Sequence, residues 1–218
     1  MPCKGNIYAT AVPASPTCGG PILVPLAGEA YYRFKEIYQM RFRVLVAAGL
    51  LTVSFGGRAI AQQVTKETVP GITNLARLET TIACAGAIKA DVAIPEIKKM
   101  GFVSVINLRE SSEPGADVER EEMLAKAAGL RYFHVPFNGN APDRRVADQF
   151  LTAITSKDAE PAFIHCSGGN RAATMWLIKR LVVDRWDVDR ATAEATALGQ
   201  TSPVLRQFAI DYARAHQR

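Results

Sequence analysis

The chain has 218 residues, of which 48% are hydrophobic and 22% charged, so it is long enough to bury one ordinary core. Residues 1–61 hold six of the 26 basic residues and only two of the 21 acidic ones, which accounts for most of the net charge of +5. The remaining 20 basic and 19 acidic residues nearly balance, so no basic face is implied and nucleic-acid partners are not expected.

A secretory leader is predicted at residues 40–61. Met40 to Arg43 is a short basic segment, Val44 to Phe55 is apolar, and Ala59-Ile60-Ala61 has small residues where a signal peptidase cleaves. The alternatives are a buried core helix or a retained membrane anchor, but a run of about a dozen residues is short for a membrane span. We therefore expect a periplasmic or secreted protein, with no stable membrane span after cleavage.

The segment before this leader has no sustained hydrophobic period. Residues 1–39 are rich in Pro, Gly, Tyr and Ala, and we interpret them as an unstructured, over-extended N-terminus, with Met40 as the true start. Cleavage after Ala61 then leaves residues 62–218 as a single folded domain. Cys3 and Cys18 are lost with the leader.

Two cysteines stay in the mature chain, Cys84 and Cys166. Two cysteines in an exported protein can pair, so Cys84 is either a small core residue or the partner of Cys166 in a reversible disulfide. The spacing of His and Cys does not suggest zinc. We therefore expect no metal and no cofactor.

Strands and helices alternate along this domain. Residues 62–70 are polar and are expected to be a mobile N-terminus, while 72–79 has no clear assignment. Strands are predicted at 80–83, 102–108, 130–135 and 161–164. Helices are predicted at 91–100, 117–128, 143–155, 172–183, 189–198 and 203–215. The pattern predicts an α/β fold with a mostly parallel central sheet flanked by helices.

The segment IHCSGGNR, Ile164 to Arg171, links a predicted strand to a predicted helix. A glycine-rich turn in this position aims several backbone N–H groups and the positive helix end at one spot, which suits an anion. A cysteine in such a nest is favoured as a nucleophilic thiolate, and an arginine at its rim can hold a tetrahedral oxyanion through two hydrogen bonds. Ligands of such sheets bind at the carboxyl ends of the strands, where Cys166 falls.

From about residue 72 to 215 the chain resembles bacterial members of the protein-tyrosine and dual-specificity phosphatase superfamily. It is most similar to the small phosphatase-like domains that also occur fused to NAD kinase or to β-lactamase-like hydrolases. The resemblance rests on IHCSGGNR and on three further segments: VINLRE at 105–110, YFHVP at 132–136 and MWLIKRLVVDRW at 175–186.

The resemblance implies a cysteine-dependent phosphatase fold and a phosphocysteine intermediate. By position, Cys166 is the nucleophile and Arg171 clamps the phosphate, while His165 supports the cysteine. The cradle for the phosphoryl oxygens is Ser167, Gly168, Gly169 and Asn170. The expected activity is hydrolysis of phosphate monoesters on a phosphorylated small molecule or a phosphoprotein, with phosphotyrosine and dual specificity among the candidates.

Three features depart from the superfamily pattern. Four residues separate Cys166 from Arg171, against the usual five, although the bacterial branch shares the shorter loop. Ala172 stands where a Ser or Thr usually steadies the thiolate. Asp143 is the only carboxylate between Val135 and the next helix, where the general acid is expected, and it also suits a helix N-cap. Arg109 either helps to hold substrate or pairs with a nearby acid.

Two other functions stay open from the sequence. The six-residue loop CSGGNR also fits rhodanese sulfurtransferases, in which the cysteine carries a persulfide, although the chain lacks a GHIPGA-like segment. Because the acid is uncertain and Ala172 follows the arginine, a catalytically weak, phosphate-binding pseudophosphatase is the other alternative.

Overall fold

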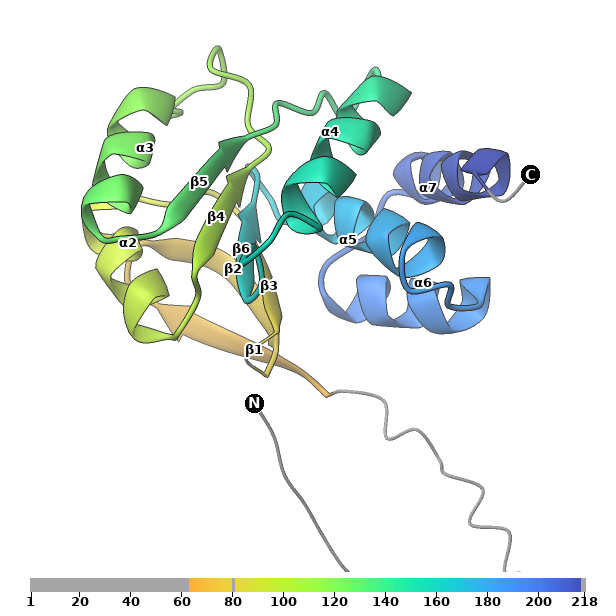
Figure 1. The fold of residues 1–218 in the computed structure, drawn as a ribbon, viewed down its shortest axis with the longest axis horizontal. Helices are drawn as coiled ribbons and strands as arrows, with labels where there is room; N and C mark the ends of the chain where they lie inside the picture. Colours follow the sequence, from red (N-terminus) through yellow and green to blue (C-terminus); the bar gives the residue numbers. More distant parts are fainter. Residues whose placement is uncertain (1–62, 80, 217–218) are drawn as a thin grey trace, which may run out of the picture. The chain divides into compact units, whose positions relative to one another are not determined.

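The computed structural model of the protein describes residues 63–79 and 81–216, so the predicted leader and the segment before it lie outside the described residues. A six-stranded sheet forms the centre, in the order β1-β2-β3-β6-β4-β5 (Figure 1). The strands are β1 (Val64–Val69), β2 (Ile72–Leu78), β3 (Ile82–Ala85), β4 (Ser104–Asn107), β5 (Arg131–His134) and β6 (Ala162–His165).

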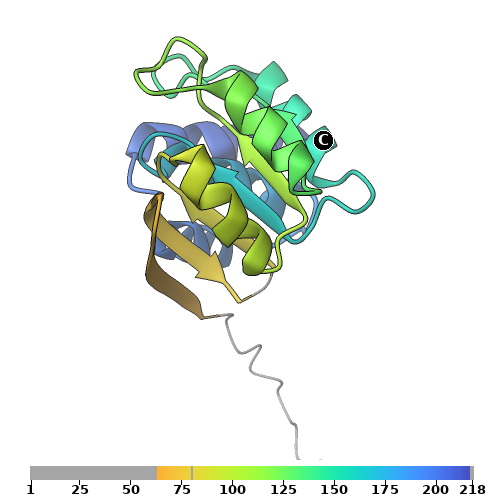
Figure 2. The ribbon, with the colours of Figure 1, turned by 90° about the vertical axis from the view of Figure 1, so that its left-hand side faces the viewer.

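Helices cover both faces of this sheet. They are α2 (Ala90–Lys99), α3 (Val118–Ala127), α4 (Arg144–Ile154), α5 (Asn170–Val182), α6 (Val188–Ala197) and α7 (Pro203–His216). Helices α2 and α3 pack on one face, and α4 to α7 lie on the other, as Figures 1 and 2 show. Each face has its own cluster of buried apolar side chains. The predicted helix-flanked α/β architecture is confirmed.

The mostly parallel sheet is also confirmed. Strand β6 lies between β3 and β4 and runs parallel to both, and β4 runs parallel to β5. All four residues of β3, β4 and β6 are buried, as expected for strands covered on both faces. Strand β2 pairs antiparallel with both β1 and β3, so the antiparallel part is confined to one edge.

The prediction of a mobile segment at 62–70 is wrong for residues 64–69, which form the edge strand β1. A tight turn at Pro70-Gly71 joins it to β2, and Gly71 has a φ of +76°, which favours glycine. The strand was not recognised because its side chains are partly or fully exposed, so the segment has no apolar period. Its stability comes from backbone pairing with β2, which is itself the unassigned segment 72–79.

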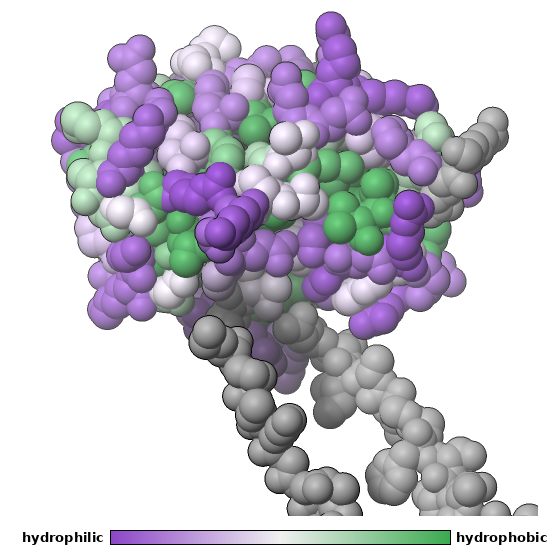
Figure 3. All heavy atoms as spheres, in the orientation of Figure 1, coloured by the Kyte–Doolittle hydropathy of each residue, from purple (hydrophilic) through white to green (hydrophobic). Residues whose placement is uncertain are grey.

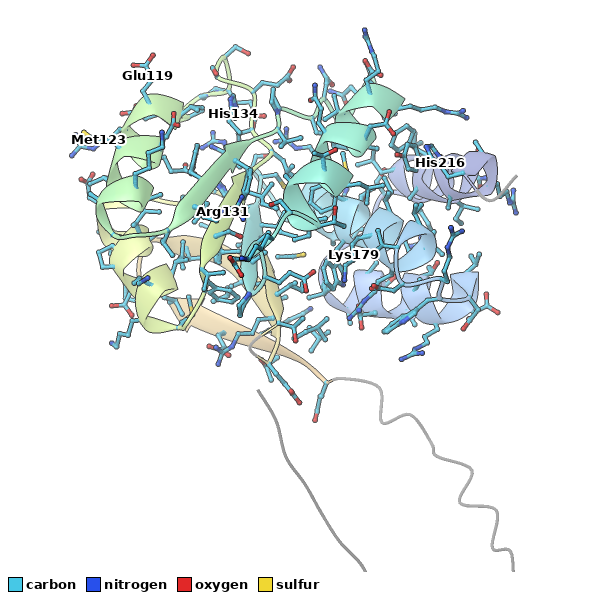
Figure 4. The ribbon with its side chains drawn as sticks, viewed as in Figure 1. Glu119, Met123, Arg131, His134, Lys179 and His216 are labelled. Carbon is cyan, nitrogen blue, oxygen red and sulfur yellow. The ribbon has the colours of Figure 1, made fainter. Side chains whose placement is uncertain are left out.

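Helix α5 supports the loop that carries Cys166. Ten of its 13 residues are buried, because the sheet lies on one side and α6 and α7 lie on the other. Arg180, at its far end, stacks on Trp176 and Trp186 and forms an ion pair with Glu194 at 2.7 Å. Lys179, labelled in Figure 4, lies over the Trp176 ring. The buried charges are therefore paired, which lets an internal helix keep two basic residues.

One face of the molecule carries many polar side chains at its surface (Figure 3). Figure 3 shows hydrophilic side chains over much of one face of the molecule, with apolar atoms between them. Within the described residues, no helix has both the length and the apolar character that a membrane crossing requires.

Candidate active site

Cys166 is the first residue after β6, and its side chain lies at the start of α5. Gly169, the N-cap residue of α5, has a φ of +97°, a left-handed conformation that favours glycine. This conformation turns the Gly169 N–H onto Cys166 Sγ at 3.1 Å. The sulfur therefore accepts a hydrogen bond at the positive end of a buried helix, an arrangement that stabilises a thiolate.

The outer side of the loop is fixed by hydrogen bonds to the β2 and β3 region. The Ala87 N–H donates to the Ser167 carbonyl at 2.9 Å, and the Asn74 amide donates to the Gly168 carbonyl at 3.2 Å. Gly86 permits this approach, because a Cβ there would lie 2.4 Å from a side-chain oxygen and 3.0 Å from the Ser167 carbonyl. Since these carbonyls point outward, the loop can present its N–H groups to the pocket.

Arg171, in the first turn of α5, is held in place by several acceptors. Its Nη1 donates to the carbonyls of Leu108 and Phe137 at 3.2 and 2.8 Å. The Glu113 carboxylate accepts from both terminal nitrogens, at 2.7 and 2.8 Å. Nη2 also donates to the Ser167 hydroxyl at 3.0 Å. The guanidinium is therefore fixed at the rim of the loop, and its role as an oxyanion clamp stays a prediction.

Glu113 is a site residue that the sequence reasoning missed. Partial burial opposes its charge, but hydrogen bonds from Arg171, from the Glu110 backbone and from Arg109 lower its pKa to about 2. It is thus ionised at neutral pH and acts as the counter-charge of Arg171. Its position on the loop after β4 could have indicated its role. Strands β4 and β6 are parallel neighbours, so the loops that follow them start at the same edge of the sheet.

Arg109 lies beneath this loop and does not line the pocket. Its guanidinium donates to the carbonyls of Pro114 and Gly115 at 2.6 and 3.0 Å and contacts Glu113 at 3.4 Å. Only 5% of the residue is exposed. Of the two roles expected from the sequence, the structure places Arg109 in pairing with an acid and in ordering the loop, and not beside a substrate.

His165 lies on the opposite face of the sheet from Cys166, as alternation along a strand requires. Its Nε2 is 2.7 Å from Glu121 Oε1 on α3, and both side chains are buried. The residue therefore supports the end of β6 from behind, and it does not line the pocket. This position does not support the predicted contact between His165 and substrate. It agrees with the predicted role of His165 in supporting Cys166.

Asp143 is the N-cap of α4 and lies outside the pocket lining. It accepts from the Arg145 backbone at 2.9 Å and forms an ion pair with the Arg145 side chain at 2.7 Å. These hydrogen bonds, that of the side chain first, lower the pKa of Asp143, so in this arrangement it is a poor proton donor. The structure therefore agrees with the capping role, and proton transfer by Asp143 stays a prediction without geometric support.

A cavity of about 420 Å³ opens over Cys166. It is lined by the predicted residues Ser167, Gly168, Asn170 and Arg171, together with residues from neighbouring loops and from α7: Glu110, Glu113, Asn138, Gly139, Asn140, Ser202 and Leu205. Within the part of the chain that the structure describes, no three His, Cys, Asp or Glu side chains converge to hold a metal.

Cys84 and Cys166 are both buried free thiols. Cys84 belongs to the apolar cluster that also contains Cys166 and Ala172, which agrees with its expected role as a core residue. Burial, followed by the charges of Cys166 and Glu194, raises the pKa of the Cys84 thiol well above its ordinary value. A reversible disulfide between the two cysteines stays a prediction.

Two comparisons of sequence found relatives of this chain. Residues 74–182, half of the chain, match the family described as beta-lactamase hydrolase-like protein, phosphatase-like domain. The beta-lactamase hydrolase-like protein of Agrobacterium fabrum is 38% identical over 89 residues, which are 38% of this chain and 20% of that protein. Its counterpart in Xylella fastidiosa strain Temecula1 is 30% identical over 124 residues, 53% of this chain and 28% of that protein.

The chain thus spans only a quarter or so of the length of these curated relatives. Among solved structures, P. aeruginosa TpbA has a TM-score of 0.52 and 19% identity, covering 72% of this chain and 92% of that chain. The catalytic core of the PP-IP phosphatase SIW14 from S. cerevisiae has a TM-score of 0.50 and 15% identity, covering 68% and 88%. At these identities the likeness shows a shared fold, while the sequence match shows that the chain belongs to the beta-lactamase hydrolase-like phosphatase domain family.

Proposed function

We propose that the protein hydrolyses phosphate monoesters through a phosphocysteine on Cys166. The observation that carries the proposal is the loop itself, where the Cys166 sulfur accepts the Gly169 N–H at 3.1 Å beside the fixed guanidinium of Arg171. A tetrahedral dianion in the pocket would meet backbone N–H groups, the positive end of α5 and Arg171 together. Membership of a phosphatase-like family supports the same reaction.

These contacts support a reaction in two steps. The Cys166 thiolate attacks phosphorus, the bond to the leaving oxygen breaks, and the phosphoryl group is transferred to sulfur. Water then attacks the phosphocysteine, which releases inorganic phosphate and restores the thiolate. The N–H groups of the loop and Arg171 stabilise the charge on the phosphoryl oxygens in both steps.

Aryl phosphates are the substrate class that we propose to test first, because their leaving groups need little protonation. A variant of TpbA has been solved in complex with pTyr, and SIW14 is a PP-IP phosphatase, so similar folds occur in proteins with different phosphorylated ligands. The polar lining of the cavity is compatible with either kind of ligand, and phosphotyrosine is the one we favour for the first assay.

The test is hydrolysis of p-nitrophenyl phosphate and phosphotyrosine by the full chain, beside Cys166→Ser and Arg171→Lys. We expect no turnover in Cys166→Ser. Lysine cannot bridge two oxygens, so we expect Arg171→Lys to lose about 2 kcal/mol of transition-state stabilisation, roughly 30-fold in kcat/KM. Undiminished activity in Cys166→Ser would end the proposal. Transfer of sulfur from thiosulfate to cyanide without phosphatase activity would favour the sulfurtransferase alternative.

Export is proposed on the sequence alone, because residues 40–61 lie outside the described residues. The mature protein would then work in an oxidising compartment, where Cys84 is the other cysteine of the mature chain.

A further inference from the structure

The proposed reaction needs a group that gives a proton to the leaving oxygen, and the acid expected from the sequence is badly placed for it. Asp143 caps α4, pairs with Arg145 and does not line the cavity. Within the described residues, two carboxylates line the cavity, Glu110 and Glu113. The choice of proton donor is therefore between two neighbours on the loop after β4.

Glu113 forms an ion pair with Arg171 and is therefore not the proton donor. Both of its oxygens accept from Arg171, at 2.7 and 2.8 Å, and one of them also accepts the Glu110 N–H at 2.8 Å. Its pKa of about 2 keeps it ionised at neutral pH. A carboxylate in this state balances the charge of Arg171 but has no proton to give.

Glu110 is carried to the same edge of the sheet as Cys166. Asn107, the last residue of β4, is in register with His165, the last residue of β6, and the Leu108 N–H donates to the His165 carbonyl at 2.9 Å. Cys166 follows its strand by one residue and Glu110 follows its own by three. The two residues therefore leave adjacent parallel strands in the same direction and line one cavity.

The loop that carries Glu110 is held on both sides. Its own N–H is bound by Glu113, and Arg109 holds the later part of the loop through the carbonyls of Pro114 and Gly115. A catalytic acid on this loop would thus be positioned before substrate binds.

The Glu110 carboxyl group has one oxygen engaged. Its Oε1 faces the Asn138 amide at 3.4 Å, and in the described part of the chain Oε2 has no hydrogen-bond partner. Asn138 is itself oriented, because its oxygen accepts from the backbones of Asn140 and Ala141 at 2.9 and 3.2 Å. The amide N–H₂ is thereby aimed at Glu110, which leaves the second carboxyl oxygen available to carry a proton.

We propose that Glu110 is the general acid and base of the phosphatase reaction, in place of the Asp expected on the loop after β5. The inference rests on the proposed function. In the first step the Glu110 carboxyl group gives its proton to the leaving oxygen as sulfur bonds to phosphorus and the ester bond breaks. In the second step the Glu110 carboxylate takes a proton from water as the water oxygen bonds to phosphorus and the phosphorus–sulfur bond breaks.

The test compares Glu110→Gln on phenyl phosphate, which has a poor leaving group, and 2,4-dinitrophenyl phosphate, which has a good one. We expect kcat/KM to fall about 100-fold or more on phenyl phosphate, because general acid catalysis contributes about 10²–10⁴-fold. On the dinitrophenyl ester we expect a change of less than about threefold, because that leaving group needs no proton. Phosphocysteine should accumulate in this variant, since its hydrolysis loses the base.

Three matched variants complete the experiment. Glu110→Asp keeps a carboxylic acid and is expected to recover much of the activity on phenyl phosphate. Glu119→Gln removes an exposed carboxylate on α3, labelled in Figure 4, and is expected to change neither ester. Asp143→Asn tests the alternative acid directly, and we expect its kcat/KM on each ester to match that of the unchanged protein.

An equal loss on both esters would show that Glu110 is structural and would overturn the inference, as would full activity of Glu110→Gln on phenyl phosphate. A loss confined to phenyl phosphate in Asp143→Asn would return the role to Asp143. The proposed function is judged separately in the unchanged protein. If no phosphocysteine forms there from the dinitrophenyl ester, the proposed function fails, whereas phosphocysteine together with a fully active Glu110→Gln refutes only the role of Glu110.

Discussion

The ion pair between Glu113 and Arg171 should contribute to stability in a way that depends on pH. The folded protein holds the pKa of Glu113 at about 2, against 4.5 for an unperturbed glutamate. A depressed folded-state pKa stabilises the protein above pH 4.5, and this contribution is lost as the pH falls towards 2. The full shift corresponds to about 3 kcal/mol, and because the carboxylate is partly open to solvent we expect about 2 kcal/mol.

Glu113→Gln removes this charge while keeping the size of the side chain. We expect the free energy of unfolding in urea to fall by about 2 kcal/mol at pH 7, and the difference from the unchanged protein to shrink by roughly 1 kcal/mol between pH 4.5 and pH 3.5. Binding of inorganic phosphate should also weaken, since Arg171 loses the acceptor that orients it.

The matched control is Glu122→Gln, which removes a half-buried glutamate that pairs with Lys126 on α3. Helix pairs at i,i+4 such as this one contribute about 0.3–0.5 kcal/mol, so little change is expected. A Glu113→Gln variant that is destabilised by less than about 0.5 kcal/mol at pH 7, or by the same amount at pH 7 and pH 3.5, would refute the reasoning.

Three further predictions concern the cap, the loop and the leader. Asp143→Ala should lose about 1 kcal/mol of stability in urea unfolding, whereas Asp143→Asn, an equally good N-cap, should not; equal losses would contradict the capping role. Gly169→Ala should cost about 1–2 kcal/mol because of its positive φ, and Gly168→Ala, which lacks this φ and has open space at its Cβ, should cost less by the same measurement. N-terminal sequencing of the protein from its native host should find Gln62 first, and a mature start within residues 1–39 would contradict the leader.

The parts of the fold that follow from sequence are those with strong periodic or capping signals. Strands β4 and β6 were expected because apolar residues run through both of them, and α3 and α4 begin where Asp117 and Asp143 offer caps. The edge strand β1 was missed because its residues are mostly exposed and its strand conformation depends on pairing with β2. Local sequence carries little trace of such pairing.

Some residues of the candidate site could likewise be predicted from the sequence, and others could not. Cys166, Arg171 and the cradle between them come from one continuous segment, so their proximity follows from the strand–turn–helix pattern alone. The carboxylates Glu110 and Glu113 reach the pocket only because β4 lies next to β6 and because Arg109 folds the following loop upon itself. These are tertiary contacts, which the local patterns of a single sequence do not reveal.

Trapping of the covalent intermediate tests the central claim most directly. The full chain is mixed with 2,4-dinitrophenyl phosphate, and the reaction is quenched with acid within the first turnover. The protein is then digested, and the masses of its peptides are measured by mass spectrometry. A phosphoryl group on the peptide that contains Cys166, absent from Cys166→Ser, is the predicted result. Release of dinitrophenol with no phosphorylated Cys166 peptide, or with the label on another residue, would contradict the account.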